Sequence, residues 1–246
     1  MADIAVIGGT GFECFPGAEI LRSENVGTPF GRPSAALEHV RLGTTGILFL
    51  SRHGTSHGIP PHRVNYRANI RALHDAGVST IIGVAAVGGI STEMRPARVV
   101  IPDQLIDYTW GRAQTFFDGD DDAVHHIDFT RPYCDGLRTL LLESAAMLEL
   151  GAADRATYGA TPGPRLETAA EIDRMQRDGC DVVGMTGMPE AALARELGLC
   201  YACCAVVANA AAGRGEGEIT MEDIQRNLDA GMQDVQRLIA ATVESL

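Results

Sequence analysis

Short, continuously apolar runs that end in glycine turns are the feature that most constrains the fold of this chain. Residues 4–7 lead directly into Gly8-Gly9-Thr10-Gly11, and residues 80–86 lead into Gly88-Gly89. Runs without polar alternation are typical of strands covered on both faces. Because helical periods separate these runs, we predict an α/β fold with a mixed or largely parallel sheet and helices on both faces.

The same patterns place the individual elements. We expect strands at 4–7, 46–50, 80–86, 99–106, 182–183 and 199–207, and helices at 65–76, 137–150, 167–178, 189–197 and 221–243. No repeat or linker interrupts the 246 residues, and 46% hydrophobic content is enough for one substantial core. We therefore predict a single domain over residues 1–246.

Composition excludes several classes of protein. The net charge of −12 disfavours general nucleic-acid binding. The sequence has no run of ~20 apolar residues, so we predict no membrane span. The first residues do not resemble a signal peptide, and we therefore expect a cytoplasmic protein. All 20 basic residues are arginine. The absence of lysine excludes a Schiff-base lysine and a Walker phosphate loop.

The cysteines and histidines do not form a recognisable metal site. The six cysteines are Cys14, Cys134, Cys180, Cys200, Cys203 and Cys204. The CxxC pair at 200 and 203 lies in an apolar strand-like run, so we interpret these cysteines as small buried hydrophobes. His53, His57 and His62 are close in sequence but lack the helical spacing of a zinc motif, and we predict no metal.

Polar or glycine-rich motifs follow five of the predicted strands, after Ile7, Leu50, Val84, Val183 and Val207. They include Gly8–Gly11, Ser51–Gly54 and the segment 184–190, and a further polar loop, 161–168, leads into a predicted helix. Ligands of open α/β sheets bind beyond the carboxyl ends of the strands, so these motifs predict one shared site. Arginine and a helix start both suit an anion. Each motif also has a plainer interpretation, as a tight turn, a surface arginine or a helix cap.

Taken together, the motifs resemble the trimeric purine nucleoside phosphorylase family, and within it the methylthioadenosine and methylthioinosine phosphorylase branch. The resemblance covers about residues 3–240 and rests on GGTG, SRHG, NYRAN, AAVGG, DQLIDYT, HIDF, GPRLET and GMTGMPEAALARE. It implies a twisted mixed sheet, partly closed into a barrel and flanked by helices, assembled as a homotrimer.

The resemblance also implies the site residues. Phosphate would be bound by Thr10, Arg52, His53, Ala86 and Thr186, with Ala86 acting through its backbone N–H. Met185 would lie under the ribose and Leu166 against the base or ribose, while His126 would reach a neighbouring subunit's 5′ pocket. The reaction would need phosphate as co-substrate and no cofactor, because positioning and electrostatics supply most of the catalysis.

Two residues bear on the purine. Relatives that act on inosine have an asparagine where this chain has Asn209 and a glutamate where it has Glu167; methylthioadenosine phosphorylases have aspartate at the first position. An ionised Glu167 would accept the N1–H of a 6-oxopurine, whereas the N1 of adenine is itself an acceptor. The amide of Asn209 can serve either base. We take Asn209, Glu167 and His53 as the candidate catalytic residues.

The 5′ group is predicted from the C-terminal segment. Inosine phosphorylases use a histidine there, but no histidine follows His126 in this chain. Met221 and Ile224 take its place and would line a methylthio pocket, or else form the buried face of the last helix. We therefore favour 5′-methylthioinosine.

Other functions remain open on the sequence. They are a methylthioadenosine phosphorylase that releases adenine, a general inosine and guanosine phosphorylase, a nucleosidase that uses water, and a non-catalytic nucleotide-binding protein. The predicted anion site argues against a nucleosidase, because water needs no anion-binding residues.

Overall fold

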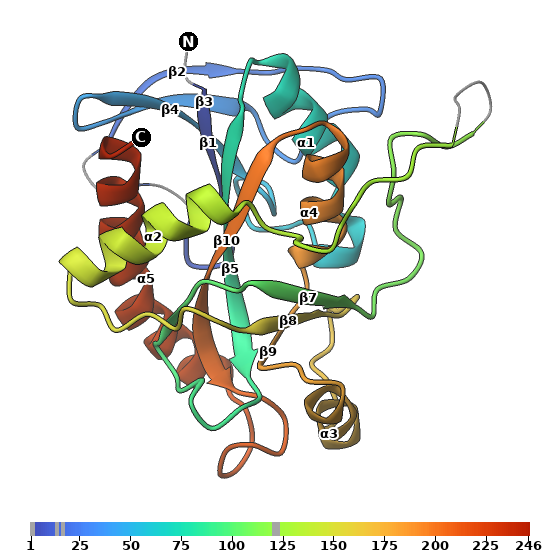
Figure 1. Cartoon of the computed structure of the whole chain (residues 1–246), viewed down its shortest axis with the longest axis vertical. Helices are drawn as coiled ribbons and strands as arrows, with labels where there is room; N and C mark the ends of the chain where they lie inside the picture. Colours follow the sequence, from blue (N-terminus) through green and yellow to red (C-terminus); the bar gives the residue numbers. More distant parts are fainter. Residues whose placement is uncertain (1–2, 13–14, 16–17, 120–123) are drawn as a thin grey trace.

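A ten-stranded mixed sheet runs through the computed structural model, which describes residues 3–12, 15, 18–119 and 124–246 (Figure 1). The strands are β1 (Ile4–Gly8), β2 (Glu19–Glu24), β3 (Leu37–Leu42), β4 (Thr45–Ser51), β5 (Thr80–Gly89), β6 (Val99–Val100), β7 (Gln104–Asp107), β8 (Thr157–Ala160), β9 (Val182–Gly184) and β10 (Cys200–Ala210). The helices are η1 (Pro61–Arg63), α1 (Tyr66–Asp75), α2 (Asp135–Met147), α3 (Ala169–Arg177), α4 (Gly187–Glu196) and α5 (Met221–Glu244).

Strand β5 is the centre of the sheet. The path runs β2-β3-β4-β1-β5-β9-β8-β7, and β10 pairs with β5 and with the short β6. Strands β1 and β10 are parallel to β5, while β9 is antiparallel to it. This confirms the α/β class with a mixed sheet. Closure of the sheet into a partial barrel stays a prediction.

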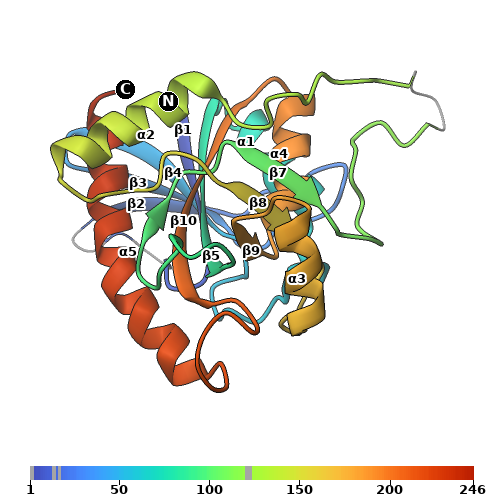
Figure 2. The ribbon, with the colours of Figure 1, turned by 60° about the horizontal axis from the view of Figure 1, so that its bottom comes forward.

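Helices cover both faces of the sheet, as the continuous apolar strands predict. Alternate residues of β5 enter different cores. Ile81 packs in the core that includes α1 and α4, whereas Ile82 packs in the core that includes α2 and α5. Figure 2 shows α2 and α5 together on one side of the sheet and α1, α4 and α3 on the other.

Most predicted elements are confirmed, with shifts at their ends. The expected helix 65–76 is α1, with Asn65 as its N-cap and Ala76 as its C-cap. The expected helix 221–243 is α5, which extends only to Glu244. Helix α3 begins at Ala169 rather than 167, because the side chain of Thr168 accepts from the backbone N–H of Glu171 and forms the N-cap.

The strand predictions failed in three places. The single run expected at 99–106 is two strands, because Pro102 has no N–H to continue a ladder. The edge hairpin of β2 and β3 was missed, since every residue of β2 is exposed and only Ile20 and Leu21 of its six residues are apolar. Strand β8 is only four residues long and lacks an apolar run.

The interpretation of the CxxC cysteines as small buried hydrophobes was wrong for Cys200. Cys134, before α2, and Cys200, at the start of β10, form a disulfide. Cys200 and Cys203 are three residues apart in a strand, so their side chains point to opposite faces and cannot pair. Cys203 is a buried free thiol, as expected; Cys180 and Cys204 are buried free thiols as well, and Cys14 lies outside the described residues. None of the described helices is long and apolar enough to cross a membrane.

Candidate active site

The predicted site residues converge on one cavity of about 570 Å³. Eleven of the twelve candidates line it: Thr10, Arg52, His53, Ala86, Leu166, Glu167, Met185, Thr186, Asn209, Met221 and Ile224. They come from the ends of β1, β4, β5, β9 and β10, from the loop between β8 and α3, and from the start of α5. The motifs that follow separate strands therefore share one site, as the sequence predicts.

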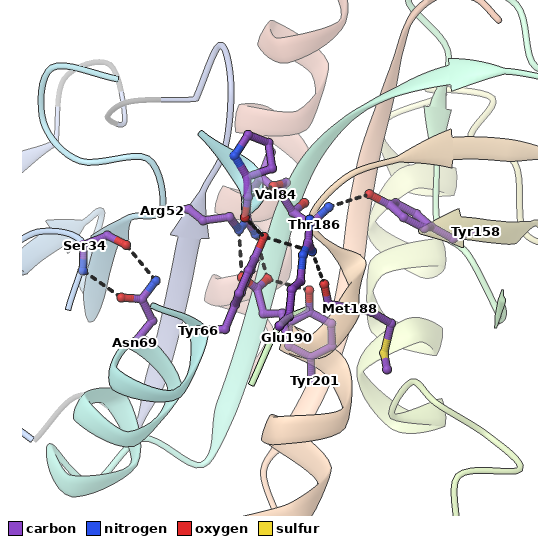
Figure 3. A network of polar contacts seen from close by, with 12 residues as sticks. Ser34, Arg52, Tyr66, Asn69, Val84, Tyr158, Thr186, Met188, Glu190 and Tyr201 are labelled. Atoms are coloured by element: carbon purple, nitrogen blue, oxygen red, sulfur yellow. Dashed lines mark hydrogen bonds and ion pairs between the residues drawn. The ribbon is translucent and has the colours of Figure 1, made fainter. Parts of the chain in front are cut away.

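Arg52 lies at the inner end of this cavity and is almost fully buried, with 1% of its surface exposed. Its Nε and Nη2 donate to the two oxygens of Glu190, each at 2.7 Å, and its Nη1 donates to the carbonyl of Val84 at 2.7 Å (Figure 3). The adjacent carboxylate keeps the pKa of Arg52 above its ordinary value, even though burial alone would lower it. Arg52 is thus a permanent cation that is already paired.

Glu190 and its second donor, Tyr201, were missed by the sequence analysis. Glu190 is fully buried in α4 and accepts a hydrogen bond from the Tyr201 hydroxyl at 2.8 Å. One sequence signal could have found it: a carboxylate within the apolar segment 188–194 needs a cationic partner.

Thr186 directly precedes α4, in which Met188 has a non-helical backbone, and its side chain makes no cap hydrogen bond. Its backbone N–H donates to the hydroxyl of the buried Tyr158 at 3.3 Å (Figure 3). The plainer interpretation of Thr186 as an ordinary helix cap is therefore wrong. A hydroxyl beside a helix start, free of capping, is a suitable donor for an anion in the cavity.

His53 and His57 form a pair of tilted rings beside Thr10. Their ring centroids are 4.8 Å apart, and Nε2 of His57 lies 3.3 Å from Oγ1 of Thr10. Nδ1 of His53 lies 2.8 Å from the carbonyl oxygen of Ile59 and must donate to it. Burial, reinforced by the charge of Arg52, lowers the pKa of His53 to about 4. His53 is therefore neutral at pH 7, with Nε2 unprotonated.

Glu167 and Asn209 contribute polar groups from two different segments. Oε1 of Glu167 accepts from the hydroxyl of Thr161 at 2.7 Å. Nδ2 of Asn209 donates to the carbonyl of Ala210 at 2.7 Å, just after an irregularity in the pairing of β10 with β5. Glu167 lies before the N-cap of α3 and does not take part in the capping of that helix, which Thr168 and Glu171 provide.

Apolar side chains line the remainder of the cavity. Met221 and Leu166 are 73% and 44% exposed, which places them at its mouth. Ile224 lines the cavity and also packs against the core under α5. His126 does not line it. This exposed residue lies in the chain between β7 and α2.

Comparison with known proteins identifies the family. The family model described as "Phosphorylase superfamily" matches residues 3–244. The chain belongs to this superfamily.

Individual relatives refine the assignment. A probable S-methyl-5′-thioinosine phosphorylase from Pseudomonas syringae is 48% identical over 245 residues, and the alignment covers 100% of this chain and 100% of the relative. A 6-oxopurine nucleoside phosphorylase from Pyrococcus furiosus is 46% identical, with 99% of this chain and 92% of the relative covered. The methylthioadenosine phosphorylase of Schistosoma mansoni, solved with adenine, superimposes with a TM-score of 0.94 at 29% identity, covering 100% of this chain and 92% of that one.

These similarities confirm the family predicted from the motifs and the enzyme class. The chain is a purine nucleoside phosphorylase-type enzyme, a pentosyltransferase with phosphate as its co-substrate. The alternative of a non-catalytic nucleotide-binding protein is thereby set aside.

Proposed function

We propose that this enzyme cleaves 5′-methylthioinosine with phosphate to give hypoxanthine and 5-methylthioribose 1-phosphate. In this reaction the bond between C1′ and the purine nitrogen breaks, a phosphate oxygen bonds to C1′, and the purine takes up a proton. One observation carries the proposal: eleven residues predicted for phosphate, sugar and base line a single cavity.

Phosphate would bind at the inner end of the cavity. Thr10 and Thr186 offer hydroxyls there, Ala86 its backbone N–H, and Arg52 the guanidinium N–H groups that Glu190 and Val84 do not occupy. Phosphate below the sugar would stabilise the cationic character that develops at C1′ as the base departs. His53 would accept, at its unprotonated Nε2, a hydrogen bond from a protonated oxygen of hydrogen phosphate, because Nδ1 already donates to Ile59.

The base would be recognised by Glu167 and Asn209. The hydroxyl of Thr161 donates to Oε1 of Glu167 and holds the carboxyl group in one orientation. The second carboxylate oxygen would then accept the N1–H of a 6-oxopurine. Asn209 would relieve the negative charge on the departing purine through its amide.

The other contacts would be apolar. Met185 would lie under the ribose and Leu166 against the ribose or base. Met221 and Ile224 would contact the 5′-methylthio group, because uncharged, apolar side chains suit a thioether. The names of the relatives from Pseudomonas syringae and Pyrococcus furiosus agree with a 6-oxopurine substrate.

We further propose a single domain over residues 1–246, a homotrimer, a cytoplasmic location and no resident cofactor. His126 would then enter the 5′ pocket of a neighbouring subunit, which agrees with its exposed position outside its own chain's cavity. Light scattering would test the trimer, and His126→Ala should raise the KM for the nucleoside without changing that for phosphate.

The decisive experiment compares 5′-methylthioinosine, 5′-methylthioadenosine and inosine, each with and without phosphate. Phosphate-dependent release of hypoxanthine from 5′-methylthioinosine, with adenine release at least about tenfold slower, is the expected result. Equal or faster release of adenine would make the enzyme a methylthioadenosine phosphorylase. Faster cleavage of inosine would contradict the methylthio pocket.

The variant Glu167→Gln sharpens this test because it keeps the shape of the side chain and adds N–H donors. It should slow cleavage of 5′-methylthioinosine and quicken that of 5′-methylthioadenosine, whose N1 accepts a hydrogen bond. An equal loss with both nucleosides would show that Glu167 does not face N1.

A further inference from the structure

The ion pair between Arg52 and Glu190 differs from every other pair in the described structure. Their side chains are 1% and 0% exposed. In each of the other arginine–carboxylate pairs formed by the described residues, at least one side chain is 43% exposed or more. Burying two charges costs desolvation that their attraction offsets poorly, so stability alone is a weak reason for such a pair.

The contacts of the pair instead fix the orientation of one guanidinium group. Glu190, from α4, binds Nε and Nη2 of Arg52 in a bidentate manner, each at 2.7 Å. Tyr201, from β10, holds the carboxylate through Oε1 at 2.8 Å, and Val84, from β5, accepts from Nη1 at 2.7 Å. The backbone N–H of Arg52 also donates to Gly8 at the end of β1. Residues of four elements, β1, β5, β10 and α4, thus hold Arg52 in place, either directly or through Glu190.

These contacts leave two N–H groups of Arg52 for a ligand. A guanidinium carries five N–H groups, and Glu190 and Val84 occupy three, so one remains on each terminal nitrogen. The glycine turn lies directly beside Nη1: a Cβ built on Gly9 would be only 2.8 Å from it. Arg52, Gly9 and Thr10 all line the cavity. Rotation of the guanidinium would turn its two free N–H groups away from the side of the cavity that Gly9 and Thr10 line.

We propose that Glu190 and Tyr201 are positioning residues that hold Arg52 in the orientation that binds phosphate. The proposal rests on the phosphate site given under the proposed function. Neither residue lines the cavity, so both would act through Arg52 rather than by touching the substrate. Tyr201 sets the carboxylate of Glu190, and the carboxylate sets the plane of the guanidinium.

The chain provides a matched control for Tyr201. Tyr133 is also buried, and its ring stacks on that of Tyr201 with centroids 6.2 Å apart. The hydroxyl of Tyr133 has no hydrogen-bond partner among the described residues. Tyr201→Phe and Tyr133→Phe therefore remove the same atom from adjacent rings, but only the first removes a contact with Glu190.

The test is the steady-state kinetics of Tyr201→Phe, Tyr133→Phe and Glu190→Gln, with titration calorimetry of inorganic phosphate on each protein. Tyr201→Phe should raise the KM for phosphate about tenfold and leave the KM for the nucleoside within about twofold, because a lost hydrogen bond to a charged group is worth about that factor. Glu190→Gln should raise the KM for phosphate further. Tyr133→Phe should change neither constant.

Two results would overturn the proposal. One is a Tyr201→Phe enzyme with an unchanged affinity for phosphate, and the other is an equal rise in both KM values, which a general loosening of the core would produce. Glu190→Gln leaves a buried cation short of a partner and can fail to fold, in which case Tyr201→Phe decides. If the wild-type enzyme cleaves none of the nucleosides, the proposed function fails, and the calorimetry still tests the positioning of Arg52.

Discussion

The hydroxyl of Thr161 donates to Oε1 of Glu167 at 2.7 Å, and this contact ties the carboxylate proposed to read the base to the residue that follows β8. Thr161 is 9% exposed, so its hydroxyl has little access to solvent. The loop that carries Glu167 otherwise has exposed residues at 164–166. The contact therefore restricts a carboxylate that would be free to rotate.

Thr161→Val keeps the shape of the side chain but removes the donor, and it should raise the KM for 5′-methylthioinosine about tenfold while the KM for phosphate stays unchanged. Thr161→Ser is the control, because it keeps the hydroxyl and should retain most of the wild-type affinity. Equal KM values for Thr161→Val and the wild type would show that Glu167 needs no such support.

Arg112 joins the loop before α3 to the start of α4. Its guanidinium donates to the carbonyls of Thr161 at 3.3 Å and Pro162 at 3.0 Å in that loop, and to that of Met188 in α4. It also lies over the ring of Tyr66 at 5.3 Å. The loop leads to Glu167, and the start of α4 follows the segment that supplies Met185 and Thr186.

We predict that Arg112→Lys lowers kcat/KM for the nucleoside about tenfold and the free energy of unfolding by about 1–3 kcal/mol. A lysine ammonium is a compact charge and cannot span three carbonyls as the planar guanidinium does. Arg131→Lys is a suitable control, since Arg131 also lies between β7 and α2 and its side chain is 75% exposed. Chemical denaturation and steady-state kinetics measure both effects. Equal losses in the two variants would contradict the role of Arg112.

Much of the fold and of the cavity could be predicted from the sequence because the signals are local. A continuous apolar run, a glycine turn and a helix cap each depend on neighbouring residues. The ends of α1 and α5 were therefore placed within a residue or two. The carboxyl ends of parallel strands meet at one edge of a sheet, so the motifs at those ends could be assigned to one site.

The features that were missed depend on partners far away in the sequence. Cys134 and Cys200 are separated by 66 residues, and no local sequence pattern around either cysteine indicates the disulfide. Arg52 and Glu190 are 138 residues apart, so the arginine could be predicted as a phosphate ligand while its buried partner was overlooked. Strand β2 was missed for a different reason: an exposed edge strand needs no apolar pattern.

The neutral state of His53 predicts how stability depends on pH. Its pKa in the folded protein is about 4, below the value of about 6.5 expected for the unfolded chain. Above pH 6.5 both states are neutral and His53 contributes no pH dependence. As the pH falls from 6.5 to 4, the unfolded chain binds the proton more readily, and the free energy of unfolding should drop by up to about 3 kcal/mol from this residue.

Urea denaturation at several pH values between 4 and 7.5 tests this prediction. The variant His53→Gln should lose this part of the pH dependence, because glutamine does not titrate. His62 is exposed, and His62→Gln should keep the wild-type pH dependence. An unchanged slope in His53→Gln would mean that the imidazole is charged in the folded protein.

The disulfide should stabilise the link between α2 and β10. It closes a loop of 66 residues, and the chain-entropy estimate for a loop of that size is about 4 kcal/mol. We predict that Cys134→Ala/Cys200→Ala, or reduction of the wild type, lowers the free energy of unfolding by up to this amount.

Reductant should have no effect on the double variant. Cys180→Ala, which removes a free buried thiol, should stay sensitive to reductant like the wild type. Denaturation curves with and without reductant decide the matter: an identical midpoint for oxidised and reduced wild type would show that the bond adds nothing to stability.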